Sequence, residues 1–199
     1  MTTKDCNILC WNVRGLNDRV KRASVRSQII TTGATIVFLQ ETKISVWTRG
    51  LLVDTVGGDL ATNVAFLPSA GVCGEILIAA SERYFTLTQT FLTTNTVSAT
   101  ITMLAENKSW TITGVYRPQS DENKILFLRE LVDLRAHTLP ACLLLGDFNL
   151  ILSAQDKNNA RLNLPMINRF RSTVDNLELA RIELRGKNTR GVTTNKPRL

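Results

Sequence analysis

An acid and an amide follow directly on an apolar, strand-like run in the last third of the sequence. The run LPACLLL leads into Gly146-Asp147-Phe148-Asn149. Carboxylate and amide oxygens bind hard cations such as Mg²⁺, and the same groups orient water or hold a phosphate. A buried core gains nothing from Asp147 and Asn149 at this place. We therefore interpret these two side chains as candidate catalytic groups at the end of a strand.

Three other predicted strands also end in polar side chains. The first strand ends at Asn12, the second at Gln40-Glu41, and the run SWTITGVY ends at Tyr116. In layered α/β proteins, reactive groups gather where strands run out into loops. One acid can hold a metal, another can activate water, and amide and phenol donors can stabilise a phosphate. This set of groups favours metal-assisted phosphodiester hydrolysis.

Each of these residues also has a purely structural interpretation. Asn12 can open a turn, Glu41 can pair with a nearby lysine, and Tyr116 can fill a core. Asp147 and Asn149 can close an Asx-turn. For any one residue taken alone the structural interpretation is the stronger, because isolated motifs are weak. The functional interpretation gains its weight from the recurrence at four successive strand ends.

The order of predicted elements describes a mixed α/β protein. Helical spacing predicts helices over 19–32 and 121–136, and a last helix that opens at Pro165. Apolar or alternating runs predict strands at 6–13, 34–42, 51–56, 61–67, 75–80, 83–92, 96–104, 109–116 and 139–149. The Thr-rich alternation in 84–102 predicts antiparallel strands with one wet face. The whole order predicts a sandwich with helices packed outside sheets.

The bulk composition fits one ordinary globular domain. The chain has 199 residues, of which 44% are hydrophobic, and no apolar run approaches the length of a membrane span. We therefore expect no membrane partner. Its four cysteines have no metal-binding spacing, so we expect reduced, buried thiols in an intracellular protein and no disulfide-linked partner. The four cysteines are Cys6, Cys10, Cys73 and Cys142.

The net charge of +7 is concentrated in two places. Five cations follow the last acid, Glu183, and leave +2 for the rest of the chain; they are Arg185, Lys187, Arg190, Lys196 and Arg198. The second cluster follows the first strand and consists of Arg14, Arg19, Lys21, Arg22 and Arg26. This second cluster is either a nucleic-acid patch or the solvated face of a helix. We expect Arg14 and Arg117, which follow two of the strand ends, to contact nucleic acid.

Four motifs in order, LCWNVRGL, FLQETK, GVYRP and LLGDFNLI, resemble those of the endonuclease/exonuclease/phosphatase family. The stretches SAGVCGEILIAAS, LILSAQDKNNARLN and MINRFRSTVDNLEL are similar to the endonuclease domain of plant LINE-type (non-LTR) retrotransposons. The resemblance implies an α/β fold in which two mixed, largely antiparallel β-sheets pack in a sandwich flanked by helices, over residues 1–186. It also implies Mg²⁺ or Mn²⁺ as cofactor, DNA as partner, and a reverse transcriptase domain in the parent element. A nuclear location would suit DNA, although the sequence has no clear targeting signal.

The resemblance assigns a role to each residue at the strand ends. Glu41 would be the principal metal carboxylate, with Asn12 beside it to place metal and phosphate. Tyr116 would contact the scissile phosphate. Asp147 would align or deprotonate the attacking water, and Asn149 would hydrogen-bond the phosphate in the transition state.

The sequence departs from the family pattern at its C-terminal end. The family motif Ser-Asp-His and the Asp-containing strand before it do not occur. The single histidine, His137, precedes Asp147 by ten positions, so we expect it at a helix C-terminus and not in the site. Residues 187–199 are basic and lack aromatic side chains, which predicts a disordered tail outside a truncated domain. A frameshift, splice or gene-model change would produce such a tail, and so would ordinary divergence.

Three functions therefore stay open at this point. The first is a Mg²⁺-dependent, DNA-nicking phosphodiester hydrolase. The second is a catalytically impaired remnant that at most binds nucleic acid or metal, because cooperating catalytic residues fail together. The third is a phosphatase of the same superfamily that acts on a small phosphoester.

Overall fold

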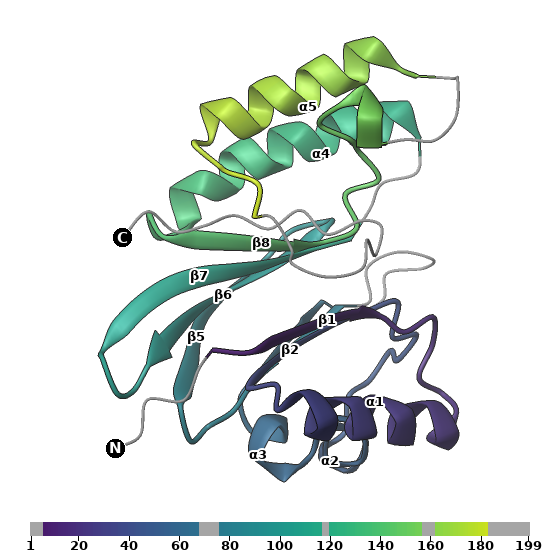
Figure 1. Cartoon of the computed structure of the whole chain (residues 1–199), viewed down its shortest axis with the longest axis vertical. Helices are drawn as coiled ribbons and strands as arrows, with labels where there is room; N and C mark the ends of the chain where they lie inside the picture. Colours follow the sequence, from purple (N-terminus) through teal and green to yellow (C-terminus); the bar gives the residue numbers. More distant parts are fainter. Residues whose placement is uncertain (1–5, 68–75, 117–119, 157–161, 183–199) are drawn as a thin grey trace.

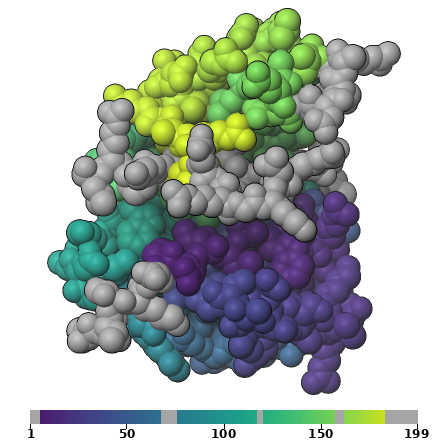
Figure 2. All heavy atoms as spheres, viewed as in Figure 1, coloured from purple at the N-terminus to yellow at the C-terminus, as the bar shows by residue number. Residues whose placement is uncertain are grey.

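Two four-stranded sheets pack face to face, and helices cover both outer faces of this pair (Figure 1). The computed structural model describes residues 6–67, 76–116, 120–156 and 162–182. The space-filling view shows the same layering, with the purple and blue N-terminal elements below and the green and yellow C-terminal helices above (Figure 2). The predicted α/β sandwich of two mixed sheets is confirmed.

The first sheet has the strand order β1-β2-β4-β3. Its strands are β1 (Ile8–Asn12), β2 (Ile36–Gln40), β3 (Val64–Leu67) and β4 (Ile76–Ala80). β1 and β2 are parallel, with Asn12 opposite Gln40, and the other two pairs are antiparallel. All five residues of β2 are buried, as its unbroken apolar run predicts for a strand covered on both faces.

The second sheet has the order β5-β6-β7-β8. Its strands are β5 (Phe85–Leu92), β6 (Thr96–Met103), β7 (Lys108–Val115) and β8 (Cys142–Gly146). The first two pairs are antiparallel, as the Thr-rich alternation predicts. β7 and β8 are parallel, with Val115 opposite Gly146. The expectation of a wet outer face is wrong for the first half of β6, where Thr96 and Ser98 are buried on the face that the helices cover.

Local capping signals set the ends of the main helices. α1 (Arg19–Thr32) starts at Asp18, whose side chain accepts from the Val20 amide, and Gly33 closes it in the left-handed conformation. α4 (Asp121–Leu134) is capped by Ser120 and continues into the short 3₁₀ helix η1 (Arg135–His137). Further helical elements are α3 (Gly58–Ala61), η2 (Ala154–Asp156) and α5 (Leu164–Asn176). No helix in the described ranges is long and apolar enough to cross a bilayer.

The predicted strand at 51–56 is wrong, because this segment lies in the helix α2 (Arg49–Val56). The Thr48 side chain caps the helix by accepting from the Leu51 amide. Leu52, Thr55 and Val56 are buried at helical spacing and belong to the layer that packs against α1. The apolar, β-branched composition favours a strand locally, and tertiary packing overrides it.

Three apolar cores separate the layers. One lies between the sheets, one between the first sheet and α1–α3, and one between the second sheet, α4 and α5. The sheets approach closely because β7 carries a glycine where it faces Phe38. A Cβ on Gly114 would lie 2.3 Å from the Phe38 ring. Close contact at this point keeps the ends of β2 and β7 together.

The cysteines are only partly as expected. Cys142 is buried and Cys10 is half-buried, but Cys6 is exposed, because it lies ahead of the first strand. Burial raises the pKa of the Cys10 thiol to about 12, which leaves it unreactive near neutral pH. Cys73 lies outside the described residues.

Candidate active site at the strand ends

The ends of β1 and β2 bring Asn12 and Glu41 together, as predicted. Because the two strands are parallel, their carboxyl ends meet at one edge of the first sheet. Asn12 Nδ2 donates to Glu41 Oε1 at 2.7 Å. Asn12 Oδ1 accepts from the Arg14 amide at 3.2 Å, which is also the local turn that the structural interpretation describes. Thus one amide side chain fixes both the carboxylate and the loop that follows β1.

The backbone around this pair is held in an uncommon conformation. Glu41 has φ of 54°, although it is not a glycine, and its carbonyl accepts from the Gly15 amide at 2.6 Å. Arg14, Lys43 and Asn149 also have positive φ, at 51°, 55° and 50°. Such conformations cost free energy, and they cluster at functional sites.

Asp147 and Asn149 lie in a tight turn beyond β8. The Asn149 amide donates to Asp147 Oδ1 at 3.0 Å, so the predicted Asx-turn exists. Between them, Phe148 is buried against Phe127 and Phe170, with ring centroids 6.2 and 5.7 Å away. The buried ring anchors the turn, while Asp147 is half-buried and Asn149 exposed.

The side chain of Gln40 joins the two sheets at this edge. Gln40 is 4% exposed, and its Nε2 donates to the Val115 carbonyl at 2.8 Å. Val115 lies opposite Gly146, so this contact places the residues after β2, β7 and β8 at one edge of the sandwich. We call the residues gathered there, Asn12, Glu41, Tyr116, Asp147 and Asn149, the strand-end site.

Sequence reasoning gave no role to Gln40 or Gly146. Gly146 has φ of +138°, and a Cβ there would lie 2.2 Å from the Val115 carbonyl oxygen and 2.9 Å from Gln40 Nε2. The available signals were a polar residue at the end of a fully buried strand and a glycine immediately before the acid. Neither signal indicates that both residues contact the Val115 carbonyl.

Tyr116 follows β7 and is half-buried. Its side chain packs against the core between the sheets, as the structural interpretation expects. Its amide donates to the Asn95 carbonyl in the β5–β6 turn at 2.8 Å. Arg117, the second residue expected to contact nucleic acid, lies outside the described residues.

The basic cluster after β1 divides into two groups. Arg22 is largely buried and pairs with Asp54 at 2.7 Å, and it also donates to the carbonyls of Leu16 and Asn17. Arg26 donates to the Val53 carbonyl. These two cations tie α1 to α2 and fix the loop after β1, so they are not free for a polyanion.

Three other cations of this cluster stay exposed. They are Arg14, Arg19 and Lys21. Lys21 Nζ lies 3.2 Å from the Arg14 carbonyl oxygen, which places its charge beside the strand-end site. The Arg22 guanidinium bonded to Asp54 lowers the pKa of that carboxyl, with the charges of Arg19 and Arg26 adding to the effect.

No three histidine, cysteine or acidic side chains come close enough to hold a metal ion in the described part of the chain. The donor set at the strand-end site is therefore small and oxygen-rich, with Glu41 and Asn12 in direct contact. Mg²⁺ retains several waters and is commonly bound through one or two carboxylates, so this donor set suits it. A site for Zn²⁺ would need more nitrogen or sulfur ligands.

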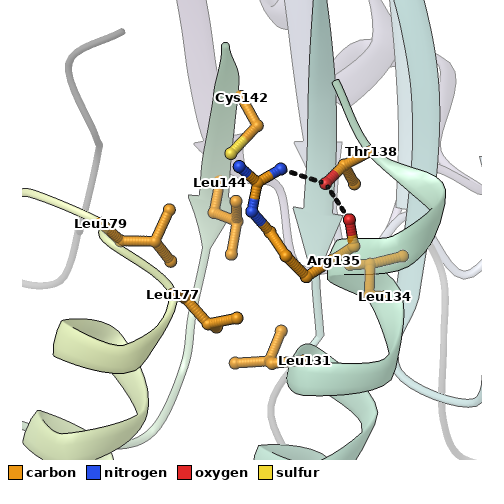
Figure 3. A pocket seen from close by; sticks show the side chains of 8 residues that line it. All are labelled: Leu131, Leu134, Arg135, Thr138, Cys142, Leu144, Leu177 and Leu179. Atoms are coloured by element: carbon orange, nitrogen blue, oxygen red, sulfur yellow. Dashed lines mark hydrogen bonds between the residues drawn. The ribbon is translucent and has the colours of Figure 1, made fainter. Parts of the chain in front are cut away.

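The single histidine lies outside the strand-end site, at the end of a helix, as expected. His137 ends η1, and its ring stacks on Phe91 with centroids 4.2 Å apart and planes 18° apart. A hollow between α4, β8 and the segment after α5 is likewise separate from the site, since it lies beside Cys142 and Leu144 in β8, not beyond Gly146 (Figure 3). Its lining is mostly leucine, with the Arg135 side chain across it. Such a lining suits packing and not phosphate chemistry.

The family of this chain follows from its match to a known family model. Residues 9–198 match the model of the Endonuclease/Exonuclease/phosphatase family. The chain belongs to this family. The match runs through residues 187–198, and the domain boundary at residue 186 stays a prediction. No curated protein matches the sequence.

Several solved structures, two of them endonucleases by name, share this fold. The endonuclease domain of TRAS1, a telomere-specific non-LTR retrotransposon, is 16% identical with a TM-score of 0.66, over 96% of this chain and 84% of that one. The AP endonuclease LMAP from Leishmania major is 14% identical with a TM-score of 0.62, over 87% of this chain and 67% of that one. Humanized D. rerio TDP2 is 14% identical with a TM-score of 0.51, over 72% of this chain and 62% of that one. At these identities the likeness establishes the fold alone.

Proposed function

We propose that this family member is a Mg²⁺- or Mn²⁺-dependent phosphodiester hydrolase domain of LINE-type retrotransposon origin that nicks DNA. The observation that carries the proposal is the Asn12–Glu41 pair, at 2.7 Å, on the edge where the Asp147–Asn149 turn also lies. Likeness to the TRAS1 endonuclease domain supports the retrotransposon origin.

Glu41 is the residue that would hold the cation, through a carboxylate that Asn12 Nδ2 orients. The cation would supply positive charge to the phosphate and to its attacking water. The small donor set supports Mg²⁺ or Mn²⁺, which prefer carboxylate, carbonyl and water oxygens. Glu41 has a φ of 54°, and its carbonyl accepts a hydrogen bond from the Gly15 amide, which supports this uncommon backbone conformation next to the carboxylate.

The other residues of the strand-end site would act on the attacking water and on the phosphate. Asp147 would orient the attacking water and accept its proton. Asn149 and Tyr116 would donate hydrogen bonds to the phosphate as its charge grows in the transition state. The exposed Arg14, next to the Asn12 turn, would bind a neighbouring phosphate of the DNA backbone.

The test is nicking of supercoiled plasmid by the purified chain, with Mg²⁺ or with EDTA. Glu41→Gln and Asp147→Asn should each lower the rate by about 10² or more, because each removes a group that acts in the transition state. Glu178→Gln is a matched control, since Glu178 is an exposed glutamate with φ of 52°, close to the 54° of Glu41. Asp175→Asn, at the exposed end of α5, controls for Asp147. Equal nicking by all five proteins would overturn the proposal.

A catalytically impaired remnant is the second candidate. It is favoured by the position of the single histidine of this sequence, His137, which packs on Phe91. Under it, folded protein would shift DNA in a gel without metal-dependent nicking, and Arg14→Ala would weaken that binding most at low salt. A small-phosphoester phosphatase would instead hydrolyse soluble phosphomonoesters and leave plasmid intact.

A further inference from the structure

The peptide group between Val115 and Tyr116 is held at both of its polar ends. Its carbonyl oxygen accepts from Gln40 Nε2 at 2.8 Å, and its N–H donates to the Asn95 carbonyl, also at 2.8 Å. The first contact comes from the other sheet and the second from the β5–β6 turn. The position at which Tyr116 leaves the second sheet therefore depends on where that turn is held.

Glu130 of α4 holds this turn. Its Oε1 accepts from the Asn95 amide at 2.9 Å and from the Thr93 hydroxyl, and its Oε2 accepts from Asn95 Nδ2 at 2.7 Å. Hydrogen bonds to an ionised carboxylate are shorter and stronger than neutral ones. α4 itself lies over the outer face of the second sheet, with Phe127, Leu128, Leu131 and Leu134 buried (Figure 1). Glu130 thus connects a rigid helix to the turn.

The hydrogen bonds within the turn close it but do not bind it to α4. Within it, the Thr93 amide donates to the Thr96 carbonyl at 3.0 Å, and the two threonine hydroxyls lie 2.6 Å apart. These contacts close the hairpin but do not fix Asn95 relative to α4. Both carboxylate oxygens of Glu130 are used to do so.

We propose that Glu130 is a positioning residue for Tyr116, acting through Asn95. The carboxylate fixes the Asn95 backbone, the Asn95 carbonyl fixes the Tyr116 amide, and the phenol is thereby held at the strand-end site. The catalytic part of this inference rests on the proposed hydrolase function, whereas the placement of Tyr116 can be measured without any activity.

The first measurement is amide hydrogen exchange at Tyr116, followed by NMR in the full chain. Glu130→Ala should speed exchange at Tyr116 by about tenfold or more, because the hydrogen-bonded turn then opens locally. Exchange at Ile112, in the middle of β7, should stay unchanged. Glu130→Gln should restore much of the protection, since its amide can still accept from the Asn95 N–H and donate to a flipped Asn95 side chain. Glu122→Gln, an exposed glutamate of the same helix, is the matched control.

The second measurement is a double-mutant cycle on plasmid nicking with Glu130→Ala and Tyr116→Phe. If Glu130 acts through the phenol, its removal should cost several-fold in rate at saturating DNA in the parent chain and little in Tyr116→Phe. Additive losses would overturn the catalytic part. Unchanged exchange at Tyr116 in folded Glu130→Ala would overturn the inference entirely. If the parent chain does not nick, the hydrolase proposal fails, and the exchange result alone decides whether Glu130 positions Tyr116.

Discussion

Gln40 Nε2 in the first sheet lies 2.8 Å from the Val115 carbonyl oxygen in the second, across 75 positions of sequence. Both groups are buried, and the contact sits between the acid of one sheet, Glu41, and the phenol of the other, Tyr116. This hydrogen bond directly joins the two halves of the strand-end site. Its loss should affect stability and site geometry together.

Gln40→Met keeps the volume of the side chain but removes the donor. The Val115 carbonyl is then left buried without that partner, and we expect a loss of about 1–3 kcal/mol in the free energy of unfolding. Urea denaturation measures it. Gln28→Met, at an exposed position of α1, should change stability by less than about 0.5 kcal/mol. A loss no larger than that of the control would show that the bridge contributes nothing.

Gly146→Ala should be severely destabilising. The residue has φ of +138°, and the added methyl would lie 2.2 Å from the Val115 carbonyl oxygen. Strain and overlap together predict a loss of about 3 kcal/mol or more, read from the urea midpoint. Gly58→Ala is the matched control, because nothing lies within 4 Å of its Cβ position; it should stay within about 1 kcal/mol of the parent. Comparable losses in both variants would contradict the steric argument.

Asp54→Asn tests the clamp between α1 and α2. The Arg22 hydrogen bond holds the pKa of Asp54 below its ordinary 3.8, so the ionised form is favoured by folding. The stabilisation is therefore present above that ordinary value and is lost as the pH falls through the lower, folded pKa. We expect the parent chain to exceed Asp54→Asn in urea midpoint at pH 6.5, by a small amount that added salt reduces. The difference should shrink as the pH falls below 3.8. Asp133→Asn, exposed on α4, should show no such convergence.

Cys10 should resist alkylation until the chain unfolds. Burial raises the pKa of its thiol to about 12, so at pH 8 only about one molecule in 10⁴ carries the reactive thiolate. Peptide mapping after iodoacetamide treatment measures this, with and without urea. In urea the residue should label at the rate of an ordinary thiol. Rapid labelling of Cys10 in folded protein would show that β1 opens readily.

The sequence alone determined the types of most elements and nominated the residues of the candidate site. The helix predicted over 19–32 forms over Arg19–Thr32, because apolar spacing and the closing Gly33 are local signals. Four polar strand ends in order were enough to nominate Asn12, Glu41, Tyr116, Asp147 and Asn149. The segment 51–56 was wrong because local composition favours a strand there, while the helix depends on packing against α1.

Only the tertiary structure decided which partners these residues meet. Gln40 and Glu130 make hydrogen bonds that span 75 and 35 residues, and Gly146 depends on a backbone angle. Sequence periodicity carries no record of either kind of constraint. The basic cluster is another example. Arg22 and Arg26 bind Asp54 and the Val53 carbonyl of α2, whereas Arg14 and Lys21 stay exposed. A side chain's chemistry is set by its type, but its role is set by what folding places within hydrogen-bonding distance.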